Sequence, residues 1–78
     1  MTTQHDLDAT YRLNGRTHHA RTHIKQEEQH GQPHYQAVIV DSPLHGTYGG
    51  WAESFDLALD FLNLAMQAEG ADEIRFAA

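Results

Sequence analysis

The dipeptide Asn14-Gly15 constrains the fold of this chain more than any other feature, because Asn-Gly is typical of the type I′ turn of a β-hairpin. Residues 7–13 before it alternate between apolar and polar side chains, which is the period of a strand with one buried face. A second strand is predicted over residues 16–26. A two-residue turn sets Asp8 opposite Arg21, so that opposite charges face each other across the hairpin. The sequence therefore predicts the hairpin together with its register.

Three further elements follow the hairpin along the chain. After a polar turn at residues 28–33, the apolar run within residues 34–40 predicts a third strand. Residues 55–69 predict a helix, and residues 72–76 predict a last short strand. The expected fold is α+β, with a single domain over residues 1–78. It is an antiparallel sheet of about three to five strands, in the order strand–strand–strand–helix–strand, packed on one long apolar helix.

The predicted helix carries more apolar surface than one small sheet covers. Ser54 is a good N-cap and Gly70 a good C-terminal stop, so the helix has defined ends. Its polar residues fall on one narrow stripe, namely Asp56, Asp60, Asn63 and Gln67. A helix lying on a sheet needs an apolar arc of little more than about 100°. Three coverings of the surplus stay open: the aromatic residues and tail of the same chain, a second copy in a homodimer through the helix, or a different partner.

The glycine-rich segment 46–51 connects the third strand to the helix and leaves room for a short additional strand. It is not a phosphate-binding loop, because the Gly-Lys-Ser/Thr ending is absent. Two interpretations of its aromatic residues stay open. Tyr48 and Trp51 either reach back into the core or act as anchors of a binding loop, since Tyr and Trp are favoured hot-spot residues.

The 78 residues include no cysteine and carry a net charge of −6 with histidine neutral. The lack of cysteine excludes disulfides, thiolate metal sites and cysteine nucleophiles. Residues 53–78 hold one basic and six acidic residues, whereas residues 1–52 hold four basic residues, five acidic residues and all seven histidines. Such an acidic end favours a basic protein partner and disfavours DNA phosphate. The N-terminus lacks signal-peptide features and no apolar stretch approaches about 20 residues, so we expect a cytoplasmic protein without membrane contact.

The serines and histidines give no catalytic or metal-binding pattern. Ser42 and Ser54 are explained by a turn and a helix cap, outside any nucleophile-elbow or Ser/His/Asp arrangement. His30, His34 and His45 are the histidines that turns could bring together, but no carboxylate–histidine spacing fits a known ligand pattern. We therefore expect no enzyme activity, no cofactor and no metal.

A basic stripe on the second strand raises the question of nucleic-acid binding. It consists of alternate residues within 17–25 and includes Arg21 and Lys25. Asp6 and Asp8 lie opposite in the predicted register and neutralise part of it, and no aromatic residue lines that face for base stacking. Direct nucleic-acid binding is therefore not expected.

These features favour a small acidic, non-enzymatic module that binds a partner protein and inhibits or neutralises it. The expected anchors are Tyr48 and Trp51. The expected acidic contacts are Glu53, Asp56, Asp60, Asp72 and Glu73. Their charge would steer the module onto a basic surface. If that surface normally holds nucleic acid, the module would compete with it, in the manner of small phage anti-CRISPR inhibitors.

Two alternatives stay open. The segment Asp41-Ser42-Pro43-Leu44-His45-Gly46, followed by Ser54 and a helix that contains Ala58, resembles the HicB antitoxin domain. That family has a Pro-Asp-Leu-Pro-Gly-like turn, a glycine and then a helix rich in Glu and Ala. The resemblance implies an antitoxin module with a basic ribonuclease toxin as its partner. The seven histidines favour the other alternative, a metal-binding or pH-responsive small domain.

Overall fold

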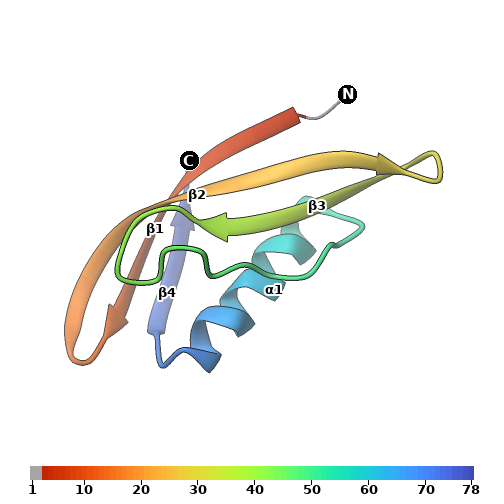
Figure 1. The fold of residues 1–78 in the computed structure, drawn as a ribbon. Helices are drawn as coiled ribbons and strands as arrows, with labels where there is room; N and C mark the ends of the chain where they lie inside the picture. Colours follow the sequence, from red (N-terminus) through yellow and green to blue (C-terminus); the bar gives the residue numbers. More distant parts are fainter. Residues whose placement is uncertain (1–2) are drawn as a thin grey trace.

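The computed structural model describes residues 3–78, which form four antiparallel strands and one helix (Figure 1). The elements in chain order are β1 (Thr3–Leu13), β2 (Arg16–Gln29), β3 (Gln32–Ile39), α1 (Phe55–Ala68) and β4 (Asp72–Ala77). The predicted α+β class is confirmed. With 14 residues, α1 is a short helix rather than the long one expected. Within the described residues, no helix combines the length and the apolar content needed to cross a membrane.

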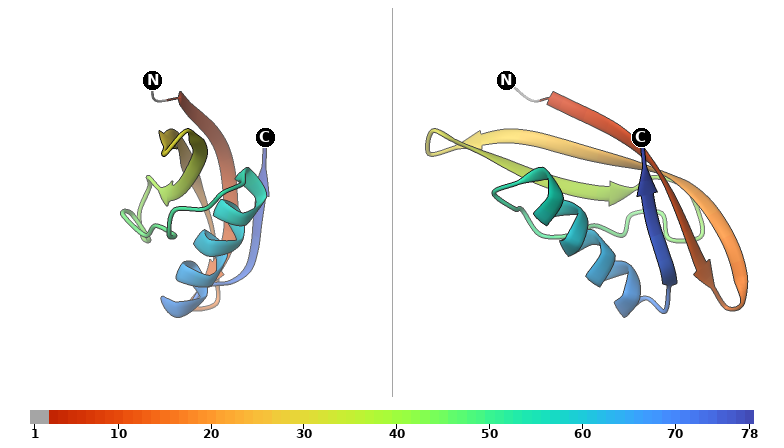
Figure 2. Two further views of the ribbon diagram at one scale, coloured as in Figure 1. Left: turned by 90° about the vertical axis from the view of Figure 1, so that its right-hand side faces the viewer. Right: turned by 180° about the vertical axis from the view of Figure 1, so that it is seen from behind.

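The sheet runs in the order β3-β2-β1-β4, and each neighbouring pair is antiparallel. Asn14 and Gly15 have φ values of 53° and 77°, as a type I′ turn requires. The register of β1 and β2 sets Asp8 opposite Arg21, so the predicted hairpin and its register are confirmed. The sheet curls along its long strands (Figures 1 and 2), and the molecule is elongated, with extents of 43 × 19 × 18 Å.

The second hairpin is tighter than the sequence predicts. Instead of a polar turn over residues 28–33, only His30 and Gly31 form the turn, with φ values of 54° and 78°. β2 therefore continues to Gln29, and β3 begins at Gln32. The prediction was wrong because glutamate and glutamine favour strands only weakly on their own, whereas pairing with the neighbouring strand holds them extended here.

One face of the sheet packs on α1, and the other face is open (Figure 2). The sheet contributes buried residues that alternate along β1 and β2: Ala9, Tyr11, Ala20 and Ile24. The helix contributes Ala58, Leu62 and Met66, which are spaced four residues apart and form one narrow stripe. The fully buried part of α1 is therefore much narrower than its apolar part.

The segment 40–54 runs along the outer edge of β3 and then past α1. It pairs with β3 only through isolated bridges, such as the one between Val38 and Tyr48, rather than as a regular strand. Gly49 approaches α1 so closely that a Cβ atom built on it would lie 2.6 Å from the backbone nitrogen of Leu62. Because only glycine permits this approach, Gly49 allows the backbone of the loop to pack directly on the backbone of α1.

Candidate protein-binding site

The side of α1 that faces away from the sheet carries an exposed apolar stripe. Leu57 and Leu64 are 39% and 61% exposed, and their spacing of two helical turns places them on the same side. Phe61 lies between them and is half-buried, and Ala68 follows one turn later and is exposed. We call Leu57, Phe61, Leu64 and Ala68 the outer stripe. Part of the apolar surplus predicted from the sequence is therefore open to solvent.

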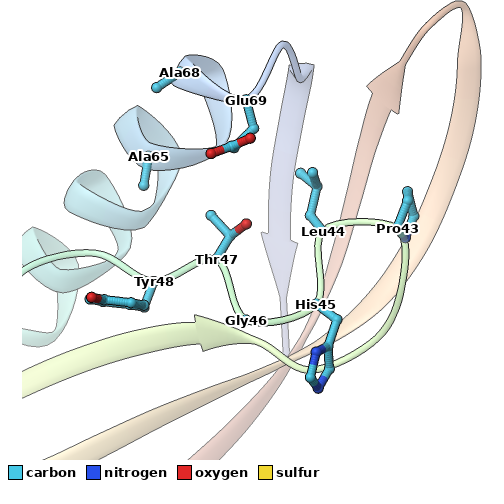
Figure 3. A pocket seen from close by; sticks show the side chains of 9 residues that line it. All are labelled: Pro43, Leu44, His45, Gly46, Thr47, Tyr48, Ala65, Ala68 and Glu69. Atoms are coloured by element: carbon cyan, nitrogen blue, oxygen red, sulfur yellow. The ribbon is translucent and has the colours of Figure 1, made fainter.

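Tyr48 extends the outer stripe from the neighbouring loop. Its side chain is 63% exposed, and it lines a pocket together with Ala65 and Ala68 (Figure 3). The loop is held in place because the Gly49 N–H donates to the Ala37 carbonyl of β3 at 3.1 Å. Tyr48 is thus an exposed aromatic side chain on an anchored backbone, which suits a binding contact.

Trp51, the other predicted aromatic anchor, is in a different situation. Its side chain is half-buried. The next residue, Ala52, exchanges two backbone hydrogen bonds of 2.7 Å with Tyr35, which hold this end of the loop on β3. The two aromatic residues therefore differ in exposure: Tyr48 faces solvent, whereas Trp51 is partly covered.

A pocket of about 500 Å³ lies where this loop meets the last turn of α1 (Figure 3). Its walls include His45, Thr47 and Tyr48 from the loop, and Ala68 and Glu69 from the end of the helix. The Glu69 carboxylate is directed across the pocket toward Thr47. Among the described residues, no lysine or arginine lines the pocket. With His45 neutral, Glu69 gives the pocket a net negative charge.

The predicted acidic contacts fall at two places. Asp56 and Asp60 are exposed on α1 beside the outer stripe, and Glu53 is exposed just before the helix begins. Asp72 and Glu73 lie beyond the opposite end of α1, at the start of β4. A helix of 14 residues separates its ends by about 20 Å. The structure thus places Asp56 and Asp60 one turn apart on α1, Glu53 just before the helix and beside the start of β3, and the other two residues beyond the opposite end of α1.

The two acidic groups also differ in their partners. Glu73 lies 3.8 Å from Arg12 across the β1–β4 pairing, as an ion pair within the chain. In the part of the chain that the structure describes, Glu53, Asp56 and Asp60 form no ion pair. None of the three carboxylates is therefore neutralised by a basic side chain of the described residues, although Asp56 lies in the first turn of α1, where the helix dipole favours an acidic group.

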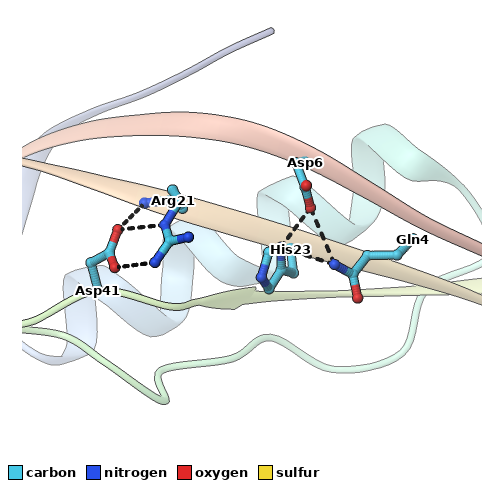
Figure 4. Close-up of polar contacts among 5 residues, drawn as sticks. All are labelled: Gln4, Asp6, Arg21, His23 and Asp41. Carbon is cyan, nitrogen blue, oxygen red and sulfur yellow. Dashed lines mark hydrogen bonds and ion pairs between the residues drawn. The ribbon is translucent and has the colours of Figure 1, made fainter.

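The open face of the sheet shows the opposite arrangement (Figure 4). The Asp41 carboxylate accepts three hydrogen bonds from Arg21: from the backbone N–H at 2.9 Å, from Nε at 3.1 Å and from Nη2 at 2.9 Å. These bonds hold the pKa of Asp41 at about 2, below its ordinary value of 3.8. Although Asp8 faces Arg21 in the register, Arg21 turns to Asp41, which accepts both arms of the guanidinium.

Asp6 on the same face is also occupied. It contacts Nδ1 of His23 and accepts a hydrogen bond from Gln4 Nε2 at 3.3 Å (Figure 4). The hydrogen bond with His23 lowers the pKa of Asp6. Two carboxylates near the open sheet face, Asp6 and Asp41, therefore have partners within the chain, which leaves less of their charge available for another protein.

The histidines do not gather into a cluster. His30 lies in the β2–β3 turn, His34 in β3 and His45 in the loop that follows. Over residues 3–78, no three His, Asp or Glu side chains lie close enough together to hold a metal ion.

Sequence reasoning missed the residues that make up most of this surface. Leu57 and Leu64 were counted only as part of a general apolar surplus, and Glu69 only as the end of the helix. A usable signal existed for the leucines, because positions 57 and 64 lie on the side of a helical wheel roughly opposite residues 58, 62 and 66, which are the buried residues of the helix. The pocket that Glu69 shares with loop residues 43–48 has no such signal, since it depends on the tertiary path of the loop.

Comparison with protein-family models gave no match, and comparisons with curated proteins and with solved structures gave no significant match. The resemblance of the 41–46 turn and the helix that follows it to the HicB domain is therefore not supported by a family model. The assignment of function rests on the surface described above.

Proposed function

We propose that this protein is a protein-binding module that docks its outer stripe and Tyr48 on a partner with a basic surface. The observation that carries the proposal is the exposure of Leu57 and Leu64 beside Asp56 and Asp60. Exposed aliphatic side chains gathered on one helix face are typical of interaction surfaces. The neighbouring carboxylates make a basic partner the best match, since complementary charge guides association and selects partners.

A second copy of the chain matches this surface less well. Each copy carries a net charge of −6. A dimer through the outer stripe would bring Asp56 and Asp60 of both helices to one interface. Like charges brought together at an interface oppose association, whereas a basic partner relieves the repulsion.

The proposed mechanism has two stages. Asp56, Asp60 and Glu53 attract the basic surface at long range and raise the rate of encounter. Leu57, Leu64 and Tyr48 then lose their contact with water and slow dissociation. Where the basic surface of the partner normally binds nucleic acid, the module competes with phosphate and inhibits the partner, as an anti-CRISPR-type inhibitor does.

Substitution of Leu64 tests the apolar stage. Proteins captured by the wild-type chain from nuclease-treated host lysate are compared with those captured by Leu64→Ser, and Leu64→Met serves as the control that keeps apolar bulk. A basic protein retained by wild type and by Leu64→Met, and bound at least about tenfold more weakly by Leu64→Ser, is the expected result. Equal binding by all three chains, measured with the purified partner, would contradict the proposal.

Charge reversal tests the steering stage. Asp56→Lys combined with Asp60→Lys should slow association and flatten its dependence on salt, with a smaller change in dissociation. Glu27→Lys combined with Glu28→Lys changes the net charge by the same amount on the β2–β3 hairpin, and it should have a much smaller effect. If both double variants slow association equally, the acidic face of α1 does not steer the partner.

A further inference from the structure

We infer that the pocket between the 43–48 loop and the last turn of α1 binds an arginine side chain of the partner. This inference rests on the proposed function, because the arginine belongs to the protein that docks on the outer stripe. The pocket adjoins that stripe, since Ala68 belongs to both and Tyr48 stands at its wall (Figure 3). It therefore lies where a partner seated on α1 would reach it.

The charge of the pocket selects a cation. Glu69 contributes a carboxylate, and no lysine or arginine of the described residues lines the pocket to neutralise it. The last turn of α1 also contains no basic residue. The carboxyl end of a helix carries partial negative charge that favours a nearby cation. Both sources of negative potential therefore act at the same place. Backbone N–H groups cap the Met66 and Gln67 carbonyls, but no basic side chain of the described residues lines the pocket to neutralise Glu69.

The shape and chemistry of the pocket favour arginine in particular. The exposed ring of Tyr48 offers an aromatic surface on which a planar guanidinium can stack. Ala65 and Ala68 supply small apolar walls for the methylene groups of the side chain. The carboxylate of Glu69 can accept two parallel N–H groups from a guanidinium, whereas an ammonium offers no such fork. A volume of about 500 Å³ is sufficient for one such side chain.

A titration of the full chain, followed by amide NMR shifts, tests the pocket without the partner. The probe is N-acetyl-arginine amide, and the matched neutral probe is N-acetyl-citrulline amide, which has nearly the same shape. We expect saturable shifts at Thr47, Tyr48, Ala68 and Glu69 with the arginine probe and none with citrulline. Equal shifts with citrulline would overturn the inference. Shifts spread evenly over Asp56, Asp60 and the pocket would overturn it as well, because they indicate general attraction to acidic residues.

Two variants assign the binding to named groups. Glu69→Gln keeps the shape of the side chain and should weaken arginine binding about threefold, as expected for an exposed ion pair. Tyr48→Leu keeps apolar bulk but removes the ring, and it should weaken binding by about two- to fivefold. Glu28→Gln removes one carboxylate from the distant β2–β3 hairpin and should leave arginine binding unchanged. Equal affinity in wild type and Glu69→Gln would exclude the assigned role of the carboxylate.

The pocket and the proposed function can fail separately. If Leu64→Ser abolishes partner binding while Glu69→Gln alters neither partner nor arginine binding, the protein-binding function stands and the arginine site is wrong. If arginine binds at the pocket but no partner depends on Leu64, the arginine site stands and the proposed docking surface is wrong. A lysine probe that binds as tightly as the arginine probe would contradict the choice of guanidinium.

Discussion

The two solvent-facing surfaces of this protein differ in how their carboxylates are paired within the chain. On the open face of the sheet, Arg21 is held by Asp41 and Asp6 by His23 (Figure 4), whereas Asp8 has no ion-pair partner among the described residues. On the outer side of α1, Asp56 and Asp60 have no ion-pair partner among residues 3–78 and lie beside exposed leucines. The sheet face thus holds carboxylates that have partners within the chain, whereas the outer side of α1 combines carboxylates that form no ion pair with exposed apolar side chains.

This contrast extends to apolar residues within α1. Ala58, Leu62 and Met66 are completely buried and define one side of the helix. Leu64 is only two residues from Leu62 but lies on the opposite side and is largely exposed. One side of α1 therefore belongs to the core, and the other, exposed side is the one that we propose binds the partner.

The same substitution at Leu62 and at Leu64 should change the free energy of unfolding by different amounts. Leu62→Ala removes buried methyl groups and leaves a cavity, so it should lower the free energy of unfolding by about 2–5 kcal/mol. Leu64→Ala changes helix propensity equally but removes mostly exposed surface, so the change should stay within about 0.5 kcal/mol. Urea unfolding followed by circular dichroism measures both. Similar losses in the two variants would show that the outer stripe contributes to the core.

Gly49 tests whether the loop must lie close against α1. A Cβ atom at this position would approach the backbone nitrogen of Leu62 to 2.6 Å and Cβ of Phe61 to 2.9 Å. Because backbone cannot yield as a flexible side chain does, Gly49→Ala should destabilise the protein by about 1–3 kcal/mol. Gly50→Ala is the control, since its Cβ would be 3.8 Å from the nearest side-chain atom of Phe61. Equal stability of the two variants would mean that the loop does not pack on the helix.

Thr22 tests the inner face of the sheet. Its hydroxyl is buried, and no hydrogen-bond partner for it is found among the described residues. A buried hydroxyl without a partner costs free energy that valine, with nearly the same shape, does not incur. Thr22→Val should therefore raise the free energy of unfolding by about 1 kcal/mol, measured by the same urea titration. A loss of stability would show that the hydroxyl has a partner, such as a buried water molecule.

The local elements of the fold were readable from the sequence. Asn14-Gly15 predicted the first turn and, through it, the register of β1 and β2, because this dipeptide accepts positive φ at both turn positions. Ser54 was correctly placed as the N-cap, since its hydroxyl accepts a hydrogen bond from the Leu57 N–H at 3.1 Å. Gly70 follows the helix with φ of 97°, as its predicted role as a stop requires. These features depend on a few neighbouring residues.

The candidate site was readable only in part, because it depends on contacts between distant segments. Tyr48 was singled out as an aromatic in a flexible-looking loop, but its exposure depends on how Gly49 meets Leu62. The sequence predicts that Asp8 faces Arg21 across the hairpin, but Arg21 binds Asp41, which follows β3 by two residues and accepts two hydrogen bonds from the guanidinium. Side-chain partners of this kind are chosen by tertiary structure, so a pattern along the chain cannot fix them.

The charge contrast itself predicts different responses to acid on the two faces. The pKa of Asp41 is held at about 2 by its hydrogen bonds with Arg21, against 3.8 ordinarily. A carboxyl group with a lowered pKa in the folded state stabilises the fold above its ordinary pKa, and this contribution is lost as the pH falls from about 4 toward 2. Asp41→Asn should therefore reduce stability at pH 7 and reduce it less at pH 2, where wild type has already lost the contribution.

Asp60→Asn provides the matched control on the helix face, since it removes the same charge from a residue without an ion-pair partner in the described chain. Urea unfolding at pH 7, 4 and 2.5 should show a stability difference from wild type that shrinks with falling pH for Asp41→Asn but stays near zero for Asp60→Asn. If Asp60→Asn lost stability in the same pH-dependent way, Asp60 would have a partner inside the fold. The helix face would then be organised like the sheet face, and its charge would no longer argue for an external partner.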